Sequence, residues 1–215
     1  MIKAVVFDWA GTTVDFGSLA PMAAFVDLFR AHGIKASVAQ ARIPMGLNKW
    51  DHIHAMLSMP EIGMQWEQLK GQAFNNSDVD SLLQEFIPMN KISIRMHSEV
   101  IPGVVPVFLE LVARGIRIGS TTGYTRELMD ILVPIAEAQG YRPEVVMCAG
   151  DTPEGRPAPY MMEKIADQFG ITDPTSVVKV DDTWPGIQEG KNYGAWTVGV
   201  VKSGNALGLS LPEWN

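Results

Sequence analysis

The chain has 215 residues, of which 47% are hydrophobic and 19% are charged, and its net charge is −7. This composition can fill a packed core and excludes a disordered chain. The negative charge opposes binding to nucleic acid and to anionic membranes, so neither is an expected partner. The single Cys148 excludes an internal disulfide. The sequence has no N-terminal export pattern and no apolar run of about 20 residues, so we expect a cytoplasmic protein.

The first predicted element is a buried strand at residues 2–7, which ends at Asp8. Small and turn-forming residues follow it as far as Asp15. In an open α/β sheet, ligands bind just beyond the carboxyl ends of the strands, so Asp8 is placed to act on a substrate. The alternative interpretation is that Asp8 caps the next helix.

The following block, residues 16–98, is predicted to be all-helical because apolar residues recur in it at helical spacing. Pro60 is expected to end the second helix and Pro88 to kink the last one. The expected helices lie at residues 18–31, 45 or 46 to 57, 64–71 and 77–96.

From Pro102 onward, predicted strands and helices alternate, and this alternation is typical of a doubly wound parallel sheet. We expect strands at 116–120, 144–148, 176–180 and 195–200, and helices at 102–114, at 125–139, from Pro157 to near Gly170, and after Pro185. The predicted fold is therefore a Rossmann-like α/β core, residues 1–15 and 99–215, with an inserted helical cap domain, residues 16–98. Residues 203–215 contain no predicted element, as in a chain cut short or a shortened member of its class.

Three later strands also lead into polar residues. Thr122-Gly123 offers a hydroxyl and backbone N–H groups for phosphate oxygens, and Arg156 can neutralise a phosphoryl group. Asp181-Asp182 offers the carboxylates that Mg²⁺ prefers. Taken one at a time, these residues have other interpretations, namely a helix-capping threonine, a solvated arginine and a second helix cap.

Taken together, the four strand-end clusters resemble the haloacid-dehalogenase-like superfamily over the whole α/β part. The resemblance implies that Asp8 is the nucleophile and carries the phosphoryl group as an aspartyl-phosphate. It also implies a phosphate site at Thr122, Gly123 and Arg156, and Mg²⁺ at Asp8, Ala10 and Asp182. Two positions depart from the phosphatases of the superfamily, because Ala10 and Gly186 stand where those enzymes commonly carry acids.

Two segments are similar to a narrower group, the phosphonoacetaldehyde hydrolase family. They are Asp8-Trp9-Ala10-Gly11-Thr12-Thr13-Val14-Asp15-Phe16-Gly17 and Met45-Gly46-x-x-Lys49. The resemblance implies hydrolysis of the P–C bond of a small phosphonate substrate, phosphonoacetaldehyde, to acetaldehyde and phosphate, through a Schiff base on Lys49. It also implies a homodimer formed through the cap.

The chemistry explains why Ala10 and Lys49 occur together. An iminium on Lys49 accepts the electrons released from the P–C bond, so no acid is needed at an oxygen leaving group. The lysine must be neutral to attack, and an apolar pocket can lower its pKa. His52 can move protons during imine formation, and Met45 and Tyr124 are further candidates for the substrate pocket. Without the resemblance, Lys49 would be interpreted as a solvated lysine, and His52 and Met45 as packing residues.

Three other functions remain open from the residues. One is a capped phosphomonoesterase or phosphomutase, which Ala10 argues against. A dehalogenase also lacks the second acid, but it would leave Lys49 unexplained. The third is an inactive phosphate-ligand-binding relative, which does not account for the presence of Asp8, Lys49, Arg156 and Asp182 together.

Overall fold

The computed structural model describes residues 1–214 and contains one parallel sheet of five strands in the order β3-β2-β1-β4-β5. The strands are β1 (Ala4–Phe7), β2 (Arg117–Thr125), β3 (Val145–Ala149), β4 (Val177–Asp181) and β5 (Trp196–Gly199). The predicted doubly wound sheet, interrupted by helices after its first strand, is confirmed.

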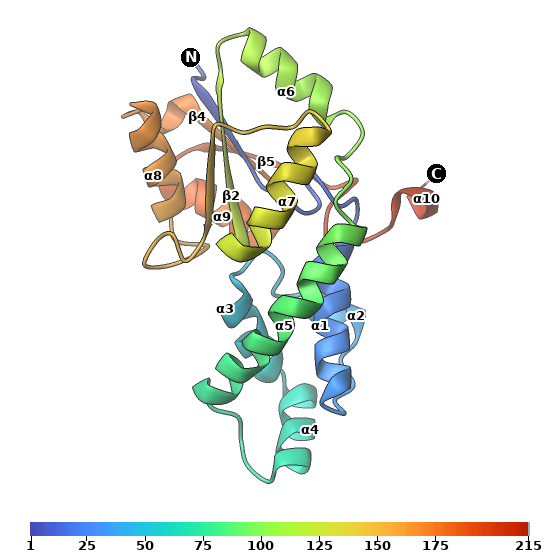
Figure 1. The fold of residues 1–215 in the computed structure, drawn as a ribbon. Coiled ribbons are helices and arrows are strands. Elements are labelled where there is room, and N and C mark those ends of the chain that lie inside the picture. The colour runs from blue at the N-terminus through green and yellow to red at the C-terminus, as the bar shows by residue number, and fades with distance from the viewer. Residues whose placement is uncertain (215) are drawn as a thin grey trace.

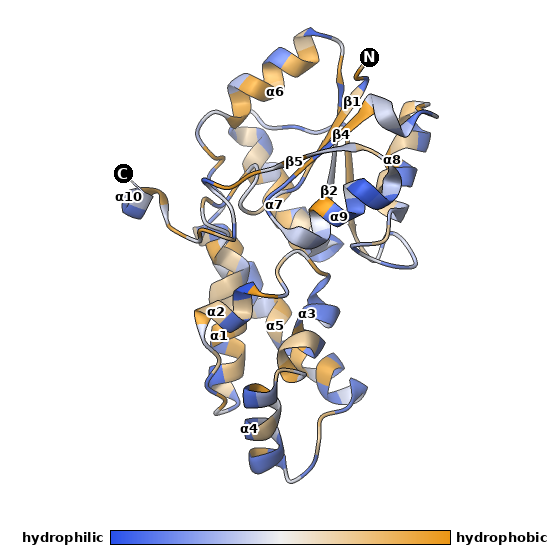
Figure 2. Cartoon of the chain, turned by 180° about the vertical axis from the view of Figure 1, so that it is seen from behind, coloured by the Kyte–Doolittle hydropathy of each residue, from blue (hydrophilic) through white to orange (hydrophobic). Residues whose placement is uncertain are grey.

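Helices cover both faces of this sheet (Figure 1). They are α6 (Val104–Ala113), α7 (Arg126–Ala138), α8 (Tyr160–Phe169) and α9 (Trp184–Tyr193), with a short 3₁₀ turn, η1, at Pro174–Ser176. Side chains of α6 and α7 share one apolar cluster with Trp9, whereas α8 packs with Val6 in a cluster on the other face. Figure 2 shows that α6 is mostly apolar, although none of its residues is fully buried.

The chain between β1 and α6 forms a separate block of helices below the sheet (Figure 1). These helices are α1 (Leu19–Ala31), α2 (Val38–Arg42), α3 (Lys49–Leu57), α4 (Pro60–Lys70) and α5 (Asn76–Met96). The block has its own apolar core, in which the rings of Phe25 and Phe86 stack with centroids 4.3 Å apart. No helix within residues 1–214 is long and apolar enough to cross a lipid bilayer.

Several predicted helix boundaries were wrong, and local backbone chemistry explains the differences. α3 begins at Lys49 and not at residue 45 or 46, because Asn48 caps it and Gly46 has a φ of +95° that a helix cannot include. Pro60 begins α4, since proline is tolerated in a first helical turn. The short helices α2 and α10 (Leu211–Trp214) were not predicted.

The register of the central strands sets the geometry of the sheet edge. Phe7 is paired with Ser120 on one side and with Val180 on the other. The next residues along the three strands, Asp8, Thr121 and Asp181, therefore lie level with one another.

The predicted end of the second strand at Ser120 was also wrong. β2 continues to Thr125, with an irregularity between Thr122 and Thr125. The Thr122 hydroxyl oxygen accepts a hydrogen bond of 3.1 Å from the Tyr124 N–H inside this irregularity. Thr122 and Gly123 are thus part of a distorted strand and not of a strand-to-helix turn.

Two chain segments connect the helical block to the core, and they lie side by side. The Asp15 N–H donates to the Glu99 carbonyl at 3.1 Å, and the Ile101 N–H donates to the Thr13 carbonyl at 2.9 Å. The Asp15 carboxylate also accepts hydrogen bonds from the first two N–H groups of α1. The entry to the block is therefore fixed by a buried carboxylate.

Candidate active site

Three carboxylates meet at the carboxyl end of the sheet. One oxygen each of Asp8, Asp181 and Asp182 lies within 4.8 Å of the others, and all three residues are buried. Burial and the charge of Asp181 raise the pKa of Asp8 to about 6, although Arg156 and Lys179 oppose this shift. Burial and the charges of Asp8 and Asp181 raise the pKa of Asp182 well above its ordinary value. The electrostatic environment of Asp8 and Asp182 therefore disfavours their charged forms.

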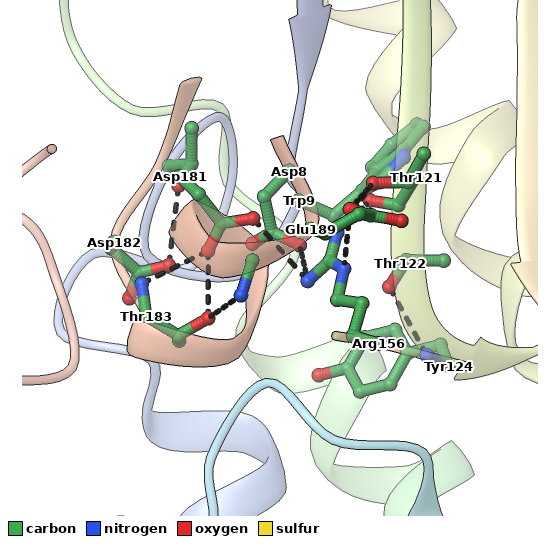
Figure 3. Close-up of polar contacts among 12 residues, drawn as sticks. Asp8, Trp9, Thr121, Thr122, Tyr124, Arg156, Asp181, Asp182, Thr183 and Glu189 are labelled. Atoms are coloured by element: carbon green, nitrogen blue, oxygen red, sulfur yellow. Dashed lines mark hydrogen bonds and ion pairs between the residues drawn. The ribbon is translucent and has the colours of Figure 1, made fainter. Parts of the chain in front are cut away.

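Arg156 is the main cation beside these carboxylates, and Figure 3 shows it reaching toward Asp8. Its Nη1 lies 2.8 Å from Asp8 Oδ1 and 3.3 Å from Asp181 Oδ2. Its Nε lies 3.0 Å from Glu189 Oε2, and its Nη2 donates to the Thr121 carbonyl at 2.6 Å. The guanidinium is thus held on several sides, with one nitrogen directed at the predicted nucleophile.

A second buried cation, Lys179, lies behind this contact. Its Nζ is 2.9 Å from Asp181 Oδ2 and 3.4 Å from Glu189 Oε2, and it donates to Thr121 Oγ1 at 2.8 Å. Asp181 Oδ1 also accepts hydrogen bonds from the N–H and the hydroxyl of Thr183. Asp181 is therefore already bound by protein partners. Within residues 1–214, Asp182 accepts side-chain hydrogen bonds from two neutral donors, Thr12 Oγ1 and the Asn205 N–H.

The buried charges of this network do not balance. Four acids, Asp8, Asp181, Asp182 and Glu189, share two direct ion-pair partners within residues 1–214, Arg156 and Lys179. With all four acids ionised, two negative charges would lack a direct ion-pair partner, and burying them away from water is costly unless a cation compensates them. One divalent ion matches this deficit, and carboxylate oxygens are suitable ligands for a hard cation.

The helical block contributes a lysine to the same place. Lys49 is the first residue of α3 and is buried. Its Nζ lies 4.6 Å from the centre of the Tyr124 ring and 5.6 Å from that of Phe25. Burial lowers the pKa of Lys49 to about 7, while Asp8 raises it and Arg156 lowers it. Within residues 1–214, the amine makes no hydrogen bond or ion pair that would hold it protonated.

A small cavity lies between the helical block and the core, and most of the predicted site residues line it. The predicted residues in its wall are Asp8, Ala10, Met45, Lys49, Thr122, Gly123, Tyr124 and Arg156, joined by Ser18, Pro21, Gly46 and Thr183. The loop before α3 closes against the core here. A Cβ atom on Gly46 would lie 2.3 Å from Thr183 Oγ1, so only glycine allows this approach.

His52 is placed differently from the other predicted residues. It does not line the cavity, because its ring stacks on Phe25 at 3.6 Å inside the helical core. Its Nε2 lies 2.9 Å from the Ala41 carbonyl, which requires Nε2 to carry the proton. Burial and the charge of Lys49 hold the pKa of His52 well below its ordinary value. His52 is thus a neutral packing partner of the residues around Lys49.

Sequence reasoning missed three residues of the site, which are Thr121, Lys179 and Glu189. All three are fully buried and contact Arg156 or Asp181. Lys179 carried a signal, because it interrupts the apolar strand Val178-Lys179-Val180 and a buried lysine needs a partner. Glu189 lies on the short polar helix α9, and no feature of the sequence around it indicated a role in the site.

Comparison with known proteins agrees with this geometry. The sequence model of the haloacid dehalogenase-like hydrolase family matches residues 2–194. A phosphonoacetaldehyde hydrolase from Paraburkholderia phytofirmans is 48% identical over 209 residues, which cover 97% of this chain and 78% of the relative. One from Hahella chejuensis is 46% identical over 213 residues, which cover 99% of this chain and 72% of the relative. The chain belongs to the phosphonoacetaldehyde hydrolase family of haloacid dehalogenase-like hydrolases.

Comparison with solved structures also gives a haloacid dehalogenase-like fold. A phosphonoacetaldehyde hydrolase-like protein from Oleispira antarctica superimposes with a TM-score of 0.97 at 44% identity, covering 99% of this chain and 77% of that chain. β-Phosphoglucomutase from Clostridium difficile gives a TM-score of 0.77 at 18% identity, over 96% of this chain and 93% of that chain, and so shares the fold alone. In the chain described here, Asp8, Thr122, Gly123, Arg156 and Lys49 line one cavity, whereas Asp182 lies beside Asp8 but not in the cavity wall.

Proposed function

We propose that this chain hydrolyses the P–C bond of phosphonoacetaldehyde to acetaldehyde and phosphate. The observation that carries the proposal is the presence of Lys49 and Asp8 in the wall of one small, buried cavity. One residue is an amine with a lowered pKa, and the other is a carboxylate beside an arginine. A reaction on an aldehyde that also carries phosphorus needs both groups.

Lys49 and Asp8 would act at opposite ends of the substrate. The neutral amine of Lys49 attacks the aldehyde carbon, and the resulting carbinolamine takes up a proton from solvent and loses water to leave an iminium. Asp8 attacks phosphorus, the P–C bond breaks, and its electron pair forms an enamine on Lys49. Protonation and hydrolysis of the enamine release acetaldehyde, and water cleaves the aspartyl-phosphate. Arg156, held by Glu189, would orient Asp8 and bind a phosphonate oxygen.

Ala10 supports this chemistry over ester hydrolysis. It lines the cavity next to Asp8, where its methyl group cannot protonate a leaving alkoxide. The enamine route needs no acid at that position. Thr122, Gly123 and Tyr124 also line the cavity, and we assign them and Met45 to substrate binding. His52 contributes indirectly, because its ring stacks on Phe25 and so supports the helix that carries Lys49.

The charge deficit supports Mg²⁺ as the cofactor. Asp8 and Asp182 would hold it, and Ala10 could add only its carbonyl oxygen, while Asp181 stays with Lys179 and Thr183. When bound, the cation would offset the repulsion between the phosphonate and the two carboxylates.

We also propose that residues 16–98 act as a cap domain that closes over the core at the two paired linkers. This supports water exclusion from the reactive iminium. Exposed apolar side chains on α4 and α5, namely Met64, Leu69 and Ile92, favour a homodimer that pairs through the cap. Sedimentation of a Leu69→Glu variant tests the dimer, which should become a monomer.

The decisive experiment is reductive trapping. Borohydride added with phosphonoacetaldehyde should inactivate the protein and place the added mass on Lys49. Lys49→Arg should lose P–C cleavage almost entirely, because a guanidinium does not become a neutral amine. Lys70→Arg is the matched control, since Lys70 also lies over an aromatic ring, Trp66, but is exposed. Labelling of another lysine, or fast hydrolysis of simple phosphate esters alone, would instead favour the phosphomonoesterase.

A further inference from the structure

Residues 203–208, a segment without any predicted element, lie across the junction between the helical block and the core. In Figure 1 the red C-terminal part of the chain runs beside the place where α1 and α5 meet the sheet. The Ser203 hydroxyl donates to the Gly11 carbonyl at 2.8 Å, and the Ser203 carbonyl accepts from the Gly17 N–H at 2.8 Å. The segment is therefore attached at two points to the chain that leads from β1 into the helical block.

Arg42, at the end of α2, connects the helical block to this segment. Its Nη1 donates to the Gly17 carbonyl at 3.0 Å, and to the carbonyl and Oδ1 of Asn205 at 3.2 and 3.0 Å. Its Nη2 donates to the Gly208 carbonyl at 3.1 Å. Asn205 Nδ2 donates back to the Arg42 carbonyl at 3.1 Å. The guanidinium thus joins three stretches of chain that are far apart in sequence.

Gly208 is shaped for this contact. It has a φ of +66°, and a Cβ atom placed on it would lie 2.5 Å from the Arg42 guanidinium carbon. A lysine in place of Arg42 could not make the same set of bonds, because its ammonium is a point charge without the planar fork.

The segment also reaches the acidic cluster. The Asn205 N–H donates to Asp182 Oδ2 at 2.7 Å, so the residue that binds Arg42 through its side chain binds Asp182 through its backbone. On the other side, Arg42 is followed by the loop that carries Met45 and Gly46 into the cavity wall. One hydrogen-bonded chain therefore runs from that loop to a carboxylate of the site.

We infer that residues 203–208 form a clasp that holds the helical block closed over the cavity. Arg42 and Asn205 are its positioning residues, and they couple closure to the orientation of Asp182. Opening of the block breaks the bonds of Arg42 and frees the Asn205 backbone, so Asp182 loses one of its two donors. The effect on turnover rests on the proposed function, but the effect on closure does not.

Hydrogen exchange of residues 44–48 and 203–208, followed by mass spectrometry, tests closure without any substrate. Arg42→Lys and the milder Asn205→Ala should each raise exchange in both segments about tenfold, as expected for loss of charge-assisted or paired hydrogen bonds. Titration of Mg²⁺ into the same proteins by calorimetry should show affinity about tenfold weaker, as for loss of support to a ligand. The value of kcat/KM for phosphonoacetaldehyde should fall by a similar factor.

Comparison of Gly208→Ala with Gly170→Ala distinguishes loss of the clasp contact from the effect of backbone strain alone. Both glycines have nearly the same φ, +66° and +67°, but nothing lies within 4 Å of a Cβ atom on Gly170. Gly208→Ala should behave like Arg42→Lys, and Gly170→Ala should leave exchange of the two segments unchanged. Unchanged exchange in both Arg42→Lys and Asn205→Ala, or equal effects of the two glycine substitutions, would overturn the clasp. Inactivity of the parent toward phosphonoacetaldehyde would refute the proposed function and leave the exchange result to decide this inference.

Discussion

Imine formation on Lys49 should depend on pH with a midpoint near neutrality. Burial among the Tyr124 and Phe25 rings lowers the pKa of Lys49 to about 7. At pH 7 about half of such an amine is neutral, against about 0.04% of a lysine with a pKa of about 10.4. The site therefore increases the reactive fraction about a thousandfold.

Asp8→Asn is the informative perturbation. The Asp8 carboxylate raises the pKa of Lys49 because it stabilises the ammonium form. Its removal should move the midpoint to lower pH, since the neutral amine then persists into more acidic solution. The same substitution blocks phosphoryl transfer, so the imine should accumulate.

The assay is trapping of the imine with cyanoborohydride, from mildly acidic to mildly alkaline pH, with the mass gain on Lys49 as readout. Asp51→Asn is the control, because Asp51 lies on the same helix but is exposed and screened by water. It should leave the midpoint unchanged. A parent midpoint near that of a free lysine, or a midpoint that rises in Asp8→Asn, would refute the burial argument.

Three further outcomes are expected. Exhaustive chelation should abolish phosphate release and Mg²⁺ should restore it, because the carboxylates of Asp8 and Asp182 are buried beside the cavity and would repel a phosphonate; full activity after chelation would exclude this role. Glu189→Gln should lower the free energy of unfolding in urea by about 3 kcal/mol, since it breaks buried ion pairs with Arg156 and Lys179. The exposed pair of Glu110 should cost under about 1 kcal/mol in Glu110→Gln. Between pH about 7 and about 10.4 the unfolded chain holds a proton on Lys49 that the folded chain has lost. The free energy of unfolding should therefore rise with pH in this window, and Lys49→Met should remove that rise.

The sequence determined where the residues of the candidate site lie in the sheet, because parallel strands end at a common edge. Asp8, Arg156 and Asp182 each follow a strand that could be recognised from its apolar run and its terminating residues. Once those strands form a parallel sheet, their polar ends must converge, whatever the details of packing. Lys49 was found through its motif with Met45-Gly46, since a lone helical lysine has no distinguishing local pattern.

Only the tertiary structure decided which side chains reach the cavity and what holds them there. His52 turns into the helical core because α3 begins at Lys49, which sets the face that packs on Phe25. The ion pairs of Glu189 and the bonds between Arg42 and Asn205 join residues that are distant in sequence. No local propensity encodes such contacts, because they arise only when burial removes competing water and leaves each polar group to find a partner in the fold.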